Sequence, residues 1–370
     1  INLNINHLFL FLIFISIFLI ITKKNKLTTI VNYELIYIFL IIFLISITLA
    51  GNLELGWDAK DFWFLKVLNF YQYENLYNLD KLPVTDYPHL GSFIWSFFWK
   101  FPFNQYEYVG RIYFIFFYII SIFSFFELLK INPVKKIILS TLTVIVTYSN
   151  ELFSGNQEIL LFSLILLSAK FSYIIFLNQK NVNNLNIIFL LLLILNSAIW
   201  IKNEGIFFLS FVLFLILVLS NLKWKEKKIL IIGTLFLVIL RIFIFQFLNT
   251  SLESFEFDKT LSYKSIENVI LNVKTIIFFS IVYLTQIPIL ALGLVLLIYN
   301  ILSFKFDKIQ IFIICFFLLN IAFIFGAFLF AMENVEWQVR VGLKRVMFES
   351  SGFYLLALIY LLNKFQGKND

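Results

Sequence analysis

Long apolar runs recur along the whole chain, and they constrain its fold more than any other feature. The hydrocarbon core of a bilayer is about 30 Å thick, so roughly 20 consecutive apolar residues are typical of a membrane-spanning helix. Eleven candidate runs occur: His7–Ile21, Val31–Ala50, Val109–Leu129, Lys136–Tyr148, Glu158–Leu177, Asn186–Trp200, Ile206–Leu222, Ile229–Leu248, Ile276–Tyr299, Gln310–Ala331 and Gly352–Leu362. The sequence therefore predicts an all-α membrane protein, a polytopic bundle of about 10–11 transmembrane helices.

The distribution of basic residues predicts the orientation of this bundle. If the runs alternate across the membrane, the short basic connections all fall on one side: Lys23–Lys26, Lys130–Lys136, Lys223–Lys228, Phe304–Lys308 and the tail from Lys364. That side is cytoplasmic by the positive-inside rule. The formal net charge of +7 is thus explained by topology. We expect no nucleic-acid partner, because the positive charges lie in short loops without a basic domain.

The longest polar segment, residues 51–108, lies on the opposite, external side in this topology. Read as a helix, Trp57–Tyr73 places four polar residues in one narrow sector: Asp58, Asp61, Asn69 and Gln72. An amphipathic helix of this kind is expected to lie in the membrane interface with its carboxylates toward water. We divide the chain into an extra N-terminal transmembrane helix with a basic cytoplasmic loop, residues 1–30, and a main module, residues 31–370.

Short motifs in the main module carry a resemblance to a known superfamily. The Trp57-Asp58 pair follows a span, and the sequence YPHLG, Tyr87–Gly91, precedes the next ones. Further along stand NELFSGNQE (Asn150–Glu158), the KNEG turn (Lys202–Gly205) and GLKRVMFESSGFYLL (Gly342–Leu356). In this order the motifs resemble the GT-C superfamily of integral-membrane glycosyltransferases, especially its bacterial RgtA/B/C/D-like and protein-mannosyltransferase-like members.

This resemblance implies a substrate pair and a location. GT-C enzymes take the sugar from a polyprenyl-phosphate donor, so the expected partners are that lipid, the bilayer and a glycan, lipid or protein acceptor of the cell envelope. The resemblance also implies an inverting transfer in the inner (plasma) membrane, with the active site facing the periplasm or exterior. A divalent cation is compatible with such a site, although the sequence contains no His/Cys cluster of metal-ligand spacing.

Sugar transfer from a lipid phosphate needs a carboxylate that accepts the proton of the acceptor hydroxyl. Asp58 is the first candidate for this base, because a carboxylate at a membrane surface is partly desolvated. The alternative is that Asp58 caps the interfacial helix. Asp61, one turn away, is a second candidate that could instead lie on a solvated helix face. Glu158 and Glu151 compete for the role of a second acid, and Glu158 could simply be a first-turn helix charge.

The departing phosphate needs cations, and four basic residues are candidates for binding it. Lys202 could instead pair with Glu204 in the tight turn between two spans. Arg241 interrupts an apolar run, where a charge either faces a partner or snorkels to the interface. Arg340 and Arg345 lie in an external basic cluster, and the alternative for them is pairing with nearby glutamates, namely Glu333, Glu336 and Glu349.

The acceptor side of the site is expected to involve Trp57, Tyr87, His89, Glu151 and Glu204, with His89 also compatible with a structural role beside Pro88. Two other functions remain open. A lipid-linked oligosaccharide flippase or transporter would also have many spans, but it should show paired broken helices or an internal repeat. A protein like an O-antigen polymerase or ligase would share the lipid donor, but it should have its largest loop late in the chain.

Overall fold

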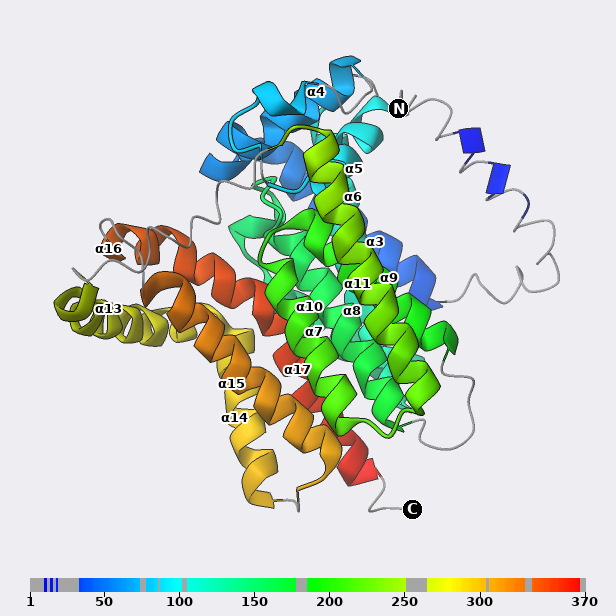
Figure 1. Cartoon of the computed structure of the whole chain (residues 1–370). Coiled ribbons are helices and arrows are strands. Elements are labelled where there is room, and N and C mark those ends of the chain that lie inside the picture. Colours follow the sequence, from blue (N-terminus) through cyan, green and yellow to red (C-terminus); the bar gives the residue numbers. More distant parts are fainter. Residues whose placement is uncertain are drawn as a thin grey trace.

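The computed structural model describes residues 33–73, 78–85, 87–101, 105–177, 185–250, 265–303, 306–329 and 335–366, together with residues 10, 11, 14, 15 and 18. All regular elements in these ranges are helices (Figure 1). The prediction of an all-helical chain is therefore confirmed for the described residues. The first predicted span, His7–Ile21, lies largely outside them.

The helices of the first half are α3 (Tyr33–Gly51), α4 (Phe64–Tyr73), α5 (Leu90–Lys100), α6 (Tyr108–Phe125), α7 (Pro133–Thr147), α8 (Glu158–Leu177) and α9 (Leu185–Ile201). Those of the second half are α10 (Gly205–Leu219), α11 (Trp224–Phe247), α13 (Ser265–Gln286), α14 (Pro288–Ser303), α15 (Lys308–Leu329), α16 (Val335–Gln338) and α17 (Lys344–Gln366). Two π-helical turns, η1 (Ala59–Trp63) and η6 (Val339–Leu343), lead directly into α4 and α17.

Six helical segments of the described chain are long and apolar enough to cross a membrane, or seven if the bent pair α13 and α14 counts as one. The two parts of that pair meet at an angle of 98°. Helices α9 and α10 are apolar but shorter, with 17 and 15 residues, and α7 also has 15. The chain is thus a multi-pass helical bundle with fewer full-length spans than the apolar runs indicate.

The segment before the last apolar run differs from the prediction. The last two apolar runs leave residues 332–351 between them as an expected external loop. The chain is instead helical from Val335 and continues through η6 into α17, a stretch of 31 residues as far as Phe365. This segment contains charged residues, so an apolar-run criterion places the start of the span too late. Most of this long helix is enclosed by other helices, and its buried charges are compensated by oppositely charged side chains from other parts of the chain.

Helices α8 and α17 form the centre of the bundle (Figure 1). Helix α8 packs against α17, α6 and α9, while α17 also packs against α14 and α15. The serines of α8 are buried, and Ser163, Ser168 and Ser172 each donate a hydrogen bond to a carbonyl three or four residues earlier. An apolar helix whose polar groups are satisfied internally can be surrounded by neighbours on all sides.

The predicted Trp57–Tyr73 helix is present, but its polar face is not all exposed. Asn69 is buried, and so is Lys66, whose ammonium donates hydrogen bonds to the carbonyl oxygens of Val84 (2.9 Å) and Tyr87 (2.8 Å). Helix α4 packs against α5, which covers this side. A helical projection of the sequence cannot include such a neighbour, so the expectation of one water-facing sector is wrong at Asn69.

Candidate functional site

Asp58 is positioned by a contact between two loops at one end of the bundle. The amide of Gly56 donates a hydrogen bond to the carbonyl of Ser154 (2.8 Å), and the amide of Ala59 donates one to Oδ1 of Asn156 (3.1 Å). The Asn156 amide group in turn donates to Glu151 (3.1 Å). A β-carbon on Gly56 would lie 2.9 Å from the Asn156 side chain, so a larger residue here would have to displace that amide group and its hydrogen bonds. The two loops therefore hold the start of the Trp57 helix in one place.

The carboxylate of Asp58 contacts Arg345 of α17, 287 residues away in the sequence. Both side chains are partly buried, at 18% and 20% exposure, and Nη1 of Arg345 is also 3.6 Å from Oε1 of Glu158. Asp58 stands at the N-cap position of η1 but makes no side-chain capping hydrogen bond. The capping interpretation of Asp58 is therefore wrong, and its carboxylate is used for an interhelical ion pair.

Lys202 lies in a cage of carboxylates next to this ion pair. Its ammonium is 2.6 Å from Glu349, 3.1 Å from Glu158 and 3.5 Å from Glu204. The Lys202, Glu158 and Glu349 side chains are 7%, 1% and 0% exposed. Burial by itself lowers the pKa of Lys202, but the three carboxylates outweigh it and raise the pKa well above its ordinary value. Lys202 is thus fully protonated at neutral pH.

Taken together, the network joins four carboxylates to two cations: Asp58, Glu158, Glu204 and Glu349 to Lys202 and Arg345. It retains unused hydrogen-bonding capacity within the described structure. Oε2 of each of the three glutamates and Nε of Arg345 are buried without a hydrogen-bond partner. Buried polar atoms of this kind are costly unless a ligand, water or proton satisfies them. The network can therefore accept hydroxyl groups and donate to an anion.

Glu151 lies beside the network and has its own electrostatic character. Its burial and the nearby charge of Glu158 raise the pKa of the Glu151 carboxyl, and the hydrogen bond from Asn156 only partly offsets this. A carboxylate with a raised pKa is a stronger proton acceptor than an ordinary one. Glu151 is thus an alternative to Asp58 as a proton acceptor at this end of the bundle.

A small polar cavity opens next to Asp58. It has a volume of about 290 Å³ and is lined by the loop before Asp58 and by the loop before α8, with the lining residues Asn52, Glu54, Leu55, Gly56, Trp57, Asn150, Phe153 and Ser154. Amide, hydroxyl and carboxylate groups thus surround a space that the indole of Trp57 also borders. Such a mixture of polar groups and aromatic residues, Trp57 and Phe153, suits a hydroxyl-rich ligand.

Arg241 does not snorkel to the membrane surface, because it is only 5% exposed. Its guanidinium donates a hydrogen bond to Oδ1 of Asn203 (2.6 Å), in the turn that carries Lys202, and lies 5.1 Å above the ring of Phe245. The ring of His89 stacks on the same Phe245 at 5.4 Å. Arg241 and His89 thus form a neighbouring cluster, which joins the Lys202 turn through Asn203.

Burial lowers the pKa of His89 well below its ordinary value, and the nearby charges of Lys66 and Arg241 act in the same direction. Both ring nitrogens are buried without a hydrogen-bond partner among the described residues. The imidazole is therefore neutral at physiological pH. It is held by ring stacking, as expected for the structural alternative, while a role in acceptor binding stays a prediction.

Three other predicted site residues lie outside the network. Arg340 is 61% exposed and pairs with Glu336 one turn away, as the pairing alternative predicted. The ring of Tyr87 packs against Phe62 and Trp63 rather than against the network. Within the described chain, no hydrogen bond or ion pair links Asp61 to Asp58 or to its partners.

Among the described residues, no group of three or more His, Cys, Asp or Glu side chains is arranged to hold a metal ion. The centre of the carboxylate cluster contains the ammonium of Lys202. The cations of the site in this structure are thus side chains, and a divalent cation stays a prediction.

The sequence indicated Glu349 only as a pairing partner of the external arginines, and it indicated no role for Asn156 or Asn203. One signal could have found Glu349: it follows Arg345 by four residues, so both lie on one face of a helix. Asn156 and Asn203 carry no local signal, because each acts by holding another site residue in place.

Comparison of the chain with known protein families, with characterised proteins and with solved structures found no match.

Proposed function

We propose that the protein is a membrane glycosyltransferase of GT-C type, which transfers a sugar from a polyprenyl-phosphate donor to a cell-envelope acceptor on the external face. The observation that carries this proposal is the contact between Asp58 and Arg345 beside the buried cage of Lys202. Three motifs of the resemblance that are far apart in the sequence supply these residues. The reaction needs a carboxylate that accepts the proton of the acceptor and a cation that binds the departing phosphate.

The proposed step is a direct displacement at the anomeric carbon. The oxygen of the acceptor hydroxyl forms a bond to this carbon, and the bond from the carbon to the phosphate oxygen breaks. The electron pair of the broken bond stays on the polyprenyl phosphate, whose negative charge increases. The hydroxyl proton passes to the carboxylate of Asp58, acting as general base, and the configuration of the sugar inverts.

Arg345 is the best candidate for binding the donor phosphate. It is partly exposed, its Nε has no hydrogen-bond partner in the described structure, and a guanidinium binds phosphate oxygens in a fork. Its present partner is Asp58. A phosphate that binds Arg345 competes with the carboxylate and releases it toward the acceptor, so donor binding would activate the base. Lys202 is already neutralised by three carboxylates, and we assign it mainly to holding Glu158 and Glu349.

The cavity beside Trp57 supports a place for the acceptor. It is lined by the residue that directly precedes Asp58, so an acceptor hydroxyl bound there would lie close to the base. Its amide and hydroxyl side chains can hydrogen-bond to a glycan, to a lipid headgroup or to a hydroxyl-bearing protein side chain. The acceptor is thus defined here only by its hydroxyl group.

One observation favours a second candidate function. The 98° break between α13 and α14 is of the kind found in transporters, where broken helices surround the substrate. Transporter folds usually have two such helices in related halves, whereas the described residues contain one. A lipid-linked oligosaccharide flippase is therefore the alternative to test.

The decisive experiment measures sugar transfer by the purified protein in detergent micelles, where no membrane separates two compartments and transport cannot contribute. Asp58→Asn should reduce transfer by about 10²–10⁴-fold, the usual contribution of a positioned base. Asp61→Asn is the matched control, because it removes a carboxylate from the same helix, and it should retain most activity. Donor extracts that support no transfer by the wild-type protein, or a wild-type rate in Asp58→Asn, would contradict the proposal.

A further inference from the structure

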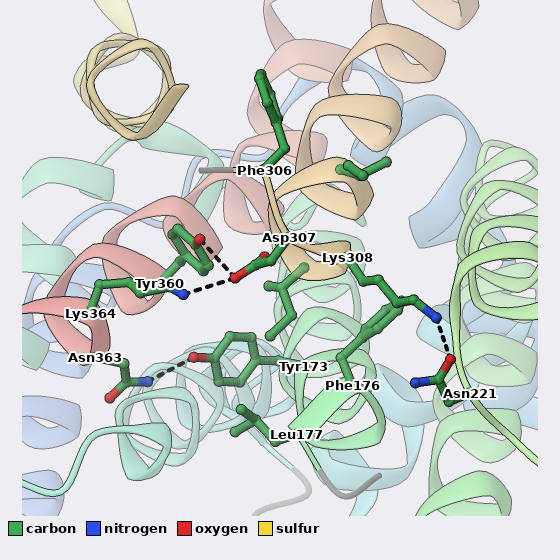
Figure 2. Close-up of a pocket in the computed structure, with 12 residues that line it drawn as sticks. Tyr173, Phe176, Leu177, Asn221, Phe306, Asp307, Lys308, Tyr360, Asn363 and Lys364 are labelled. Atoms are coloured by element: carbon green, nitrogen blue, oxygen red, sulfur yellow. Dashed lines mark hydrogen bonds and ion pairs between the residues drawn. The ribbon is translucent and has the colours of Figure 1, made fainter. Parts of the chain in front are cut away.

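A second and larger cavity lies at the opposite end of the bundle from Asp58, with a volume of about 860 Å³. Its walls come from the last turns of α8 and α17, the connection between α10 and α11, and the start of α15 (Figure 2). Helix α8 contributes Glu158 to the first site and Tyr173 to this cavity. Because its 20 residues rise about 30 Å, the two sites lie near opposite membrane surfaces.

The carboxylate in this cavity is already fully used. Asp307 accepts hydrogen bonds from the backbone amide of Gln310 (3.0 Å) and from the hydroxyl of Tyr360 (2.9 Å), and it forms an ion pair with Lys364 (2.9 Å). Burial alone would raise the pKa of Asp307, but these partners lower it below its ordinary value. Asp307 is therefore ionised and pairs with Lys364, whose side chain is still 42% exposed.

A second lysine leaves the cavity with net positive charge. The ammonium of Lys308 contacts the amide oxygen of Asn221, which is a neutral group (Figure 2). None of the described carboxylates lies within ion-pair distance of Lys308. Among the described lining residues, Lys308 and Lys364 stand against Asp307, an excess of one positive charge.

The rim of the cavity is apolar. Phe306 and Leu177 line it and are 62% and 54% exposed. A purely water-soluble ligand would not use these side chains, whereas an amphipathic one would cover them while its charged group reaches the lysines. The cavity volume is also within the usual range of about 300–1,000 Å³ for ligand sites.

We propose that this cavity binds a phosphate group through Lys308 and Lys364, and that the phosphate belongs to an anionic phospholipid of the adjacent leaflet. Basic pockets between transmembrane helices at a membrane surface are suited to anionic headgroups. A soluble phosphate compound offers the same charged group and is the other source to test. The proposal does not depend on the glycosyltransferase reaction, because no residue of the Asp58 network takes part.

The test measures binding directly. The full-length protein is purified in detergent and titrated with phosphatidylglycerol, with phosphatidylcholine or with inorganic phosphate, and bound lipid is counted by native mass spectrometry alongside the thermal unfolding midpoint. Lys308→Gln and Lys364→Gln should each weaken phosphatidylglycerol binding by about fivefold, since each lysine near an anionic lipid contributes about that factor. Lys135→Gln and Lys225→Gln, exposed lysines that do not line the cavity, are the matched controls.

The titrations distinguish a phospholipid site from a site for a soluble phosphate compound. Retention of phosphatidylglycerol over phosphatidylcholine, weakened in the two cavity variants and kept in the two controls, supports a phospholipid site. Binding of inorganic phosphate with the same dependence on Lys308 and Lys364, without lipid retention, supports the phosphate group and assigns it to a soluble ligand. Equal binding of the two lipids, or equal loss in the control variants, overturns the proposal.

Discussion

Replacing Lys202 with glutamine tests whether the carboxylate cage stabilises the fold only because of its central cation. The ammonium of Lys202 lies within 3.1 Å of both Glu158 and Glu349, and these three side chains are at most 7% exposed. Glutamine is close in length but carries no charge. Its introduction leaves two buried carboxylates without their main counter-ion, while Glu158 keeps a weaker contact with Arg345 at 3.6 Å.

The size of the effect follows from this geometry. Removing one partner of a buried ion pair typically costs about 3–5 kcal/mol, because the other charge remains buried without compensation. Since Arg345 still partly compensates Glu158, we expect Lys202→Gln to cost about 3 kcal/mol, at the lower end of that range. At roughly 2 °C per kcal/mol for a chain of this size, the unfolding midpoint should fall by about 6 °C.

A double variant makes the test specific. In Lys202→Gln/Glu349→Gln the buried negative charge that lost its partner is also removed, so stability should recover by about 1–3 kcal/mol relative to Lys202→Gln. The assay is thermal unfolding of purified protein in one detergent, followed by tryptophan fluorescence. Lys135→Gln, an exposed substitution, should stay within about 0.5 kcal/mol of wild type. A Lys202→Gln midpoint equal to wild type, or a double variant less stable than the single one, would refute the reasoning.

Three further predictions address the donor, pH and topology. Arg345→Lys keeps the charge but loses the guanidinium fork, so it should raise the KM for the lipid donor more than it lowers kcat, and equal donor affinity in both proteins would count against phosphate binding. Because the pKa of Asp307 is lowered in the folded protein, its carboxylate stabilises the fold above pH 3.8, the ordinary value, and this contribution is lost as the pH falls through the folded pKa. The unfolding midpoint of Asp307→Asn should therefore depend less on pH in this acidic range than that of wild type. In a cysteine-free background, cysteines at Asn75 and Ser254 should react with an impermeant reagent in intact cells and one at Lys225 should not, and the reverse pattern would invert the orientation.

The sequence predicted features that depend on one stretch of the chain better than features that depend on contacts between distant parts. Apolar runs predicted helices correctly along most of the described chain, because a long apolar stretch favours a helix from its own residues alone. The start of the last helix was placed too late, since Arg345 and Glu349 make it look polar. Their charges are compensated by Asp58 and Lys202, which belong to other parts of the chain.

For the candidate site, short motifs indicated several of the residues that meet, among them Asp58, Glu158, Lys202 and Arg345. The sequence could not predict which of them pair. Nor could it distinguish a helix cap from a site carboxylate at Asp58, because both interpretations need only an aspartate near a helix start. The contact with Arg345 decided this point.

The sequence by itself determined the helical class of the chain, the approximate positions of its apolar helices and the clustering of basic residues in a few short connections. The tertiary structure alone decided which helix faces meet. The physical reason lies in helices such as α8, which is apolar on every side and carries no amphipathic signal that would fix its rotation. The rotation is set by packing against α17, α6 and α9, and it brings Glu158 to Lys202 and Arg345.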